Sequence, residues 1–137
     1  MLIDEIQDQI IEEFQPRTEM LDKYRYLTQL AKEMKPLDQV FKIDQNSIKG
    51  CQSSLWIVTR LHDGKMEIRG DTDVIITKGI LSLILRVYNN QNPKDILEKD
   101  LYFLEKIGLK QTLSPQRANG VGAVIQHIKH TAKLNLK

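Results

Sequence analysis

Residues 55–70 read LWIVTRLHDGKMEIRG, and this stretch decides the fold class. Segment 55–60 is rich in β-branched and aromatic residues, which favour strands. Asp63-Gly64 is a strong signal for a two-residue hairpin turn, and apolar and polar residues alternate again over 66–70. We therefore predict an antiparallel β-hairpin over 55–70.

The segment that follows the hairpin predicts a buried helix. Residues 74–88 are apolar nearly all round, as in a helix packed by neighbours on several sides. Gly79 in its middle lowers helix stability by about 1 kcal/mol relative to Ala, so we expect a close backbone contact there. Asp71-Thr72-Asp73 supplies side-chain oxygens that can cap the start of this helix.

Further helices are predicted on both sides of this central part. Segments 2–15 and 17–34 repeat apolar residues at helical spacing and are separated by Pro16, so we expect a helical hairpin. Short helical pieces follow around 96–97 and 101–107, the second stopped by Gly108, and Ser114-Pro115 starts a last helix toward Lys133. The fold class predicted is α+β, a small antiparallel β-sheet packed by helices, in a single domain over 1–137.

Composition excludes several classes of protein. The chain has 137 residues, enough for one hydrophobic core, and a net charge of +2 that gives no electrostatic footprint for nucleic acid. The N-terminus is acidic and does not resemble a signal peptide, and the apolar stretch 74–88 is too short and too charged to span a membrane. A single cysteine allows no internal disulfide, so the cytoplasm is the expected compartment.

Cys51 is the side chain best suited to carry out chemistry. It lies in a mostly polar stretch, 35–53, that leads into the first strand. Gly50 permits close approach of the backbone, and neighbouring amides, Gln52 and Ser53 can hydrogen-bond a thiolate or a persulfide anion. The alternative is that a lone cysteine serves as a small buried hydrophobe. The polar context favours a reactive thiol.

Several thiol chemistries lack the residues that they require. A redox relay needs a second thiol, a cysteine hydrolase needs an activating histidine, and a structural zinc site needs four ligands. His62, His127 and His130 show no spacing that links them to Cys51, and we expect no metal. What remains is a thiol that acts without a resident base or cofactor, and carrying a group covalently for another protein fits that absence.

The Cys51 segment resembles the active-site loop of the SufE family of sulfur acceptors. The resemblance extends in order over nearly the whole chain. The matching segments are Asn46-Ser47-Ile48-Lys49-Gly50-Cys51-Gln52-Ser53-Ser54-Leu55-Trp56, Gly70-Asp71-Thr72-Asp73 with Lys78-Gly79, Pro93-Lys94-Asp95-Ile96-Leu97, Phe103-Leu104-Glu105-Lys106-Ile107-Gly108-Leu109, and Leu113-Ser114-Pro115-Gln116-Arg117-Ala118-Asn119-Gly120.

This resemblance implies a specific activity. Cys51 would accept a persulfide sulfur from a cysteine desulfurase, SufS or CsdA, and pass it to a SufB-containing scaffold for iron–sulfur cluster assembly. Gly50, Gln52 and Ser53 would support the persulfide loop. Asp73 and Arg117 would lie on the desulfurase-binding face. Pyridoxal phosphate belongs to the desulfurase, so this chain is expected to bind no cofactor.

Alternatives to these assignments stay open. Asp73 can equally be a helix cap, whereas Arg117 lies in the first turn of a helix, where the dipole disfavours a cation and a specific partner is expected. Trp56 is expected in the core. The chain can belong to a CsdE-like branch that feeds another sulfur-requiring pathway. Rivals from other classes are a cluster scaffold, since the family's fold resembles that of IscU, and a thiol enzyme. A monomer or weak homodimer is expected.

Overall fold

The hairpin predicted from residues 55–70 is present in the computed structural model, which describes residues 1–49, 54–109 and 115–136, without the side chains of 115–117. Strand β1 (Leu55–His62) pairs antiparallel with β2 (Lys65–Thr72), with Leu55 opposite Thr72 and His62 opposite Lys65. Asp63 and Gly64 both have positive φ, 52° and 76°, as a tight primed hairpin turn requires.

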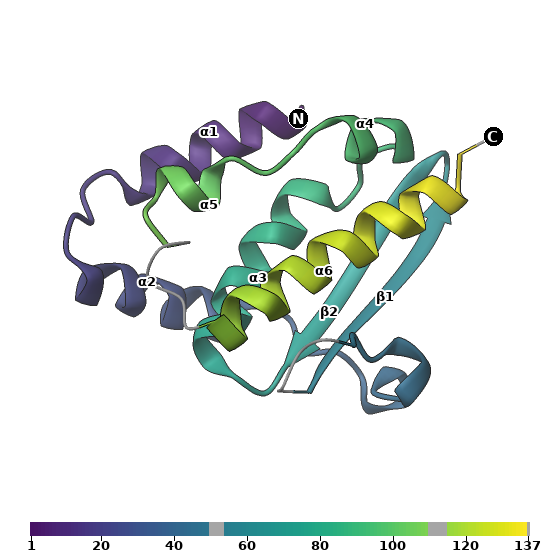
Figure 1. Cartoon of the computed structure of the whole chain (residues 1–137), viewed down its shortest axis with the longest axis horizontal. Helices are drawn as coiled ribbons and strands as arrows, with labels where there is room; N and C mark the ends of the chain where they lie inside the picture. Colours follow the sequence, from purple (N-terminus) through teal and green to yellow (C-terminus); the bar gives the residue numbers. More distant parts are fainter. Residues whose placement is uncertain (50–53, 110–114, 137) are drawn as a thin grey trace.

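Helix α3 (Ile75–Tyr88) is the central element of the fold (Figure 1). Strand β2, α1 (Ile3–Phe14), α2 (Met20–Glu33) and α6 (Pro115–Leu134) all contact it. Its buried side chains therefore face several neighbours, as the nearly all-apolar sequence predicted.

The two N-terminal helices pack mainly on α3. They meet each other near their connection, where the rings of Phe14 and Tyr26 lie 5.1 Å apart, edge to face. The Glu13 carboxylate accepts hydrogen bonds from the Tyr26 hydroxyl at 2.6 Å and from Arg86 of α3 at 3.0 Å. The predicted helical hairpin thus exists at its turn, and α3 provides the larger surface for α2.

Gly79 confirms the predicted close backbone contact. A Cβ atom placed there would lie 2.4 Å from the carbonyl oxygen of Leu27 in α2. The absence of a side chain therefore lets α2 and α3 approach each other at this crossing.

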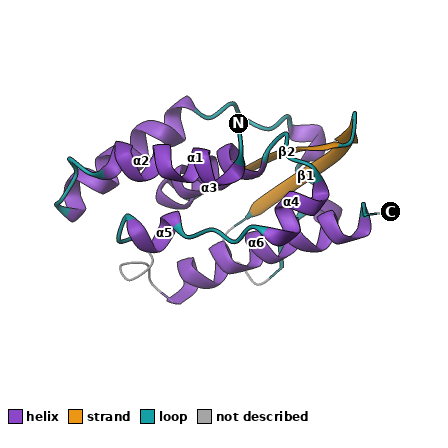
Figure 2. Cartoon of the chain, turned by 90° about the horizontal axis from the view of Figure 1, so that it is seen from above, coloured by secondary structure: helices purple, strands orange, loops and turns teal. Residues whose placement is uncertain are grey.

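The remaining two helices, both short, pack mainly on α6 and α1. Asn92 caps α4 (Pro93–Glu98) by accepting the Asp95 amide at 2.9 Å, and α5 (Phe103–Lys106) is followed by Gly108 at φ 77°. Helix α6 lies beside α4 and α3, and seen from above the hairpin lies on the side of the molecule away from α2 (Figure 2). Within the described parts of the chain, no helix has the length and apolar character to cross a membrane.

The hairpin has two different faces. One face is buried against the helices and consists of Leu55 and Ile57 from β1 and Met66 and Ile68 from β2. The opposite face carries Trp56. Residues 37–48 lead to this hairpin, and we call them the strap. The strap contains the 3₁₀ turns η1 (Gln39–Phe41) and η2 (Asp44–Asn46). The second turn, η2, contacts β1.

Candidate functional site

The two ends of the segment that carries Cys51 are held together. Gly50, Cys51, Gln52 and Ser53 lie outside the described residues, between Lys49 and Ser54. On either side of them, the Ile48 amide donates a hydrogen bond to the Leu55 carbonyl at 2.9 Å, and Ser47 and Trp56 form an antiparallel bridge. The segment therefore leaves and re-enters the described structure at one place, the start of β1.

Strand β2 fixes the re-entry point. The Thr72 hydroxyl donates to the Ser54 carbonyl at 2.8 Å, and the Asp73 amide also donates to it at 3.4 Å. Ser54 is thus tied to the last residue of β2 and to the turn before α3.

A buried carboxylate lies one residue before Thr72. The Asp71 side chain is 3% exposed, and its Oδ1 and Oδ2 atoms lie 3.0 Å from Lys78 Nζ and 3.2 Å from Lys42 Nζ, respectively. The same oxygens accept the Thr72 amide at 2.8 Å and the Leu37 amide at 3.2 Å. We call Asp71, Lys42 and Lys78 the Asp71 cluster.

The electrostatics of the cluster favour the charged carboxylate. Burial by itself raises the pKa of Asp71, because it removes water from the anion. The hydrogen bonds from Lys78, from the Leu37 and Thr72 amides and from Lys42 outweigh this effect and lower the pKa below its usual value. The cluster is therefore a set of two ammonium groups around one anion, with a net positive charge.

Lys42 also joins the strap to the outer face of the hairpin. Its ammonium lies 5.2 Å from the centre of the Trp56 ring, a cation–π contact, and Trp56 is the cross-strand partner of Asp71. Trp56 is half-buried beneath the strap, so the expectation of a core tryptophan is only partly met: its neighbours include a lysine rather than apolar side chains alone.

The capping role predicted for Asp71-Thr72-Asp73 is wrong. Strand β2 continues through Thr72, and the N-cap of α3 is Val74, which makes no side-chain capping bond. Asp71 and Thr72 instead pair with β1, and the Asp71 carboxylate binds the two lysines. Asp73 is exposed, with its backbone directed to Ser54.

The other predicted site residues are placed only in part. Arg117 belongs to the first turn of α6, and its side chain lies outside the described residues. His62 is on the hairpin, whereas His127 and His130 lie on α6. In the described parts of the chain, histidine, cysteine and acidic side chains form no group of three or more that is able to hold a metal ion.

Sequence reasoning assigned no role to Lys42 or Lys78 and the wrong one to Asp71. One signal was available: aspartate is depleted in strands, and Asp71 directly follows a glycine at the end of one. Lys42 had no such signal, because it comes from a separate segment that meets Asp71 only in the folded chain.

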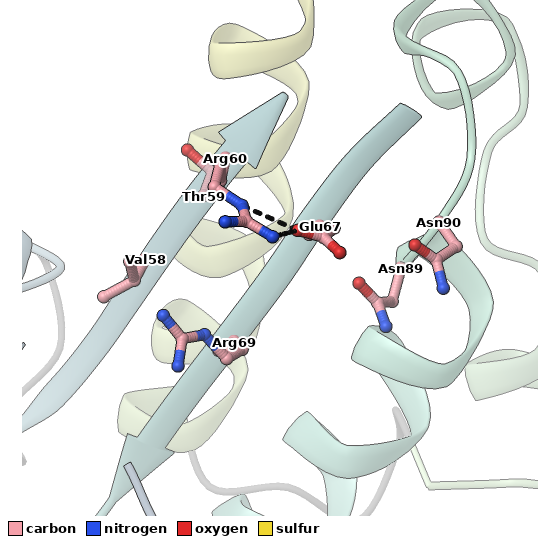
Figure 3. Close-up of a pocket in the computed structure, with 7 residues that line it drawn as sticks. All are labelled: Val58, Thr59, Arg60, Glu67, Arg69, Asn89 and Asn90. Atoms are coloured by element: carbon pink, nitrogen blue, oxygen red, sulfur yellow. Dashed lines mark hydrogen bonds and ion pairs between the residues drawn. The ribbon is translucent and has the colours of Figure 1, made fainter. Parts of the chain in front are cut away.

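A separate polar cleft of about 350 Å³ lies along the hairpin (Figure 3). Arg60 and Glu67 form an ion pair across its two strands, and Arg69, Asn89 and Asn90 line it further. The sequence predicted none of these as site residues.

The comparison with protein families decides the family of the chain. Residues 8–132 match the family described as SufE, Fe-S metabolism associated domain. The chain belongs to the SufE family. An uncharacterized SufE-like protein of Rhizobium meliloti (strain 1021) is 34% identical over 131 residues, with 92% of this chain and 94% of the relative covered. The family resemblance in the sequence is thereby confirmed.

A solved structure supports the fold of this SufE-family chain independently. The solution structure of a hypothetical protein from Thermus thermophilus superposes with a TM-score of 0.75 and covers 94% of each chain, at 17% identity. This likeness concerns the fold alone, and it confirms the α+β class. Membership of the SufE family supports a sulfur-acceptor role in iron–sulfur metabolism.

Proposed function

We propose that this chain accepts a persulfide sulfur on Cys51 from a pyridoxal-phosphate cysteine desulfurase, SufS-like or CsdA-like, and delivers it to a SufB-containing scaffold. The observation that carries the proposal is SufE membership of a chain with a single cysteine. The cysteine lies in the segment whose two ends are fixed at the start of β1.

The transfer needs no net oxidant or reductant. The Cys51 thiolate attacks the terminal sulfur of the donor's persulfide, and a new S–S bond forms on Cys51 while the donor's S–S bond breaks. The donor cysteine leaves as a thiolate, which takes up the proton that Cys51 gave to solvent. Delivery repeats the exchange, with Cys51 as the leaving thiolate. Gly50, Gln52 and Ser53 are proposed to support the charged sulfur, and pyridoxal phosphate stays with the desulfurase.

Asp73 is proposed to contribute to the desulfurase-binding face together with Arg117. Asp73 supports this role because it is exposed and its backbone is bound to Ser54, next to the segment that must reach the donor. A contact of this kind should change the affinity for desulfurase more than the rate of transfer in the saturated complex.

Replacement of the thiol tests the function. Cys51→Ser should retain the fold and desulfurase binding but abolish sulfur acceptance, because a hydroxyl is not nucleophilic enough to open a persulfide. The measurement is cysteine turnover by the desulfurase in the presence of each variant. We expect stimulation by the natural chain and competitive inhibition by Cys51→Ser.

The matched control is Ser54→Ala, which removes an exposed hydroxyl nearby and leaves the Ser54 carbonyl in place. It should stimulate turnover as the natural chain does. Equal stimulation by Cys51→Ser would show that the thiol is not the acceptor and would contradict the proposal.

A further inference from the structure

The Asp71 cluster is a costly arrangement for a purely stabilising role. Three charged side chains, with exposed fractions of 3%, 17% and 22%, are withdrawn from water at one point. Desolvation offsets much of the attraction within such groups, and apolar replacements are often as stable. A buried, fully hydrogen-bonded carboxylate instead fixes the relative positions of the groups that it binds.

Three segments converge on the Asp71 carboxylate, and a fourth joins them through Lys42. It lies on β2, and it receives Lys78 from α3 and both Lys42 and the Leu37 amide from the strap. Lys42 in turn covers Trp56 on β1. The carboxylate therefore locks the strap and α3 to the open end of the hairpin.

These segments are also the ones that anchor the Cys51-bearing segment. The strap ends at Ile48, which bonds to Leu55, and the neighbour of Asp71 in the chain, Thr72, holds the Ser54 carbonyl at 2.8 Å. Any shift of the strap relative to the hairpin would change the distance between the two ends, Lys49 and Ser54, that residues 50–53 connect.

We propose that Asp71 is a positioning residue for sulfur transfer to Cys51, acting through the strap and Thr72 to hold the two ends of the cysteine segment in the geometry that the desulfurase complex requires. This inference rests on the proposed function. Loss of attack geometry by about 1 Å can slow a reaction about 100-fold.

The charge of the Asp71 cluster distinguishes a positioning role from activation of the Cys51 thiol. Two lysines and one aspartate give the cluster a net charge of 2 − 1 = +1, and Asp71→Asn raises it to +2. Added positive charge favours a nearby thiolate, so this substitution should not raise the pKa of the Cys51 thiol. Slower transfer without a raised thiol pKa is thus the signature of lost positioning.

The experiment is a single-turnover transfer from persulfide-loaded desulfurase to saturating amounts of each variant, followed by mass spectrometry. Asp71→Asn should lower the transfer rate constant by about 10- to 100-fold. The pH midpoint of Cys51 alkylation should stay the same or fall. Thr72→Val, which removes only the bond to Ser54, should show a smaller loss and remains informative if Asp71→Asn unfolds.

Gln7→Ala is the matched control for destabilisation. Gln7 is another fully buried polar side chain, but it joins α1 to residues 100–103 and not to the hairpin. It should leave the transfer rate within about twofold, since its contacts are remote from the site.

Three outcomes would overturn the inference. They are natural transfer rates in both Asp71→Asn and Thr72→Val, an alkylation midpoint that rises with the loss of rate, or an equal loss in Gln7→Ala. If the natural chain itself accepts no sulfur on Cys51, the proposed function fails and the Asp71 inference falls with it. Normal acceptance with normal rates in the variants overturns only the role of Asp71.

Discussion

His127, half-buried on α6, makes the stability of the fold depend on pH. Burial, and to a lesser degree the neighbouring His130, lower its pKa below the usual 6.5. The folded chain then binds fewer protons than the unfolded chain once the pH falls below 6.5, so protonation favours unfolding. The loss of stability begins as the pH falls through 6.5 and is complete below the pKa of His127 in the folded chain.

The His127 prediction concerns a difference between two proteins. The natural chain should lose more stability than His127→Gln between about pH 8 and about pH 5, because only the natural chain carries this proton. Denaturant unfolding at the two pH values measures both losses. Equal losses would mean that His127 titrates alike in the folded and unfolded states.

Single residues show where sequence reasoning stopped. Cys51 was recognisable because it is the chain's one thiol and follows a glycine in a polar stretch of the sequence. Asp71 was misassigned as part of a helix cap, because the local pattern of aspartate and threonine before a helix is the pattern of a cap. Its true partners, Lys42 and Lys78, are distant in sequence or on the next element, and only tertiary folding brings them to it.

At the scale of elements, periodicity was a sound guide. The hairpin turn at Asp63-Gly64, the buried helix α3 and the breaks at Pro16 and Gly108 all follow from local rules of backbone conformation. The 3₁₀ turns of the strap were not predicted, because their residues have no sustained period and their shape depends on contacts with the hairpin.

At Gly79, where α2 and α3 cross, we predict that a glycine-to-alanine substitution changes stability in the direction opposite to the usual one. Replacing a helical glycine by alanine normally stabilises a helix by about 1 kcal/mol. Gly79→Ala should instead destabilise the fold by about 1–3 kcal/mol, since the new Cβ would meet the Leu27 backbone at 2.4 Å and backbone gives way at high cost.

The matched control is Gly122→Ala on α6, where a new Cβ would meet nothing within 4 Å. It should stabilise the fold by about 0.5–1 kcal/mol. Denaturant midpoints measure both variants. A stabilised Gly79→Ala would show that α2 and α3 do not approach as closely as described.

At the scale of the whole molecule, buried polar side chains tie together parts that are distant in sequence. Gln7 is fully buried in α1; its amide nitrogen donates to the Asp100 carbonyl at 3.1 Å, and its oxygen accepts the Tyr102 and Phe103 amides. It thereby satisfies the backbone of the α4–α5 connection.

Gln7→Ala should lower the free energy of unfolding by about 1–3 kcal/mol, because it leaves buried backbone groups without partners. The control Gln126→Ala removes an exposed glutamine and should change stability by less than about 0.5 kcal/mol. Urea unfolding gives both values, with a reduced midpoint and an unchanged slope expected for Gln7→Ala. Similar midpoints for the two variants would argue against the Gln7 network.

The fold class of the whole molecule was predictable from the sequence, but the packing arrangement of its helices was predictable only in part. Alternation, helical period and turn signals were enough for an antiparallel hairpin packed by helices. The central place of α3 among α1, α2, α6 and β2 depends on which apolar faces meet, and local patterns do not specify that choice. The activity assigned to the site depended on the SufE resemblance, because no local rule links a lone thiol to sulfur transfer.

The central claim, that Cys51 accepts sulfur from a desulfurase, is tested most directly by the intact mass of the chain after mixing with a cysteine desulfurase and free cysteine. We predict a gain of one or more sulfur atoms that reductant removes and that Cys51→Ser does not show. An active SufS-like and an active CsdA-like desulfurase that both leave the mass unchanged would contradict the account.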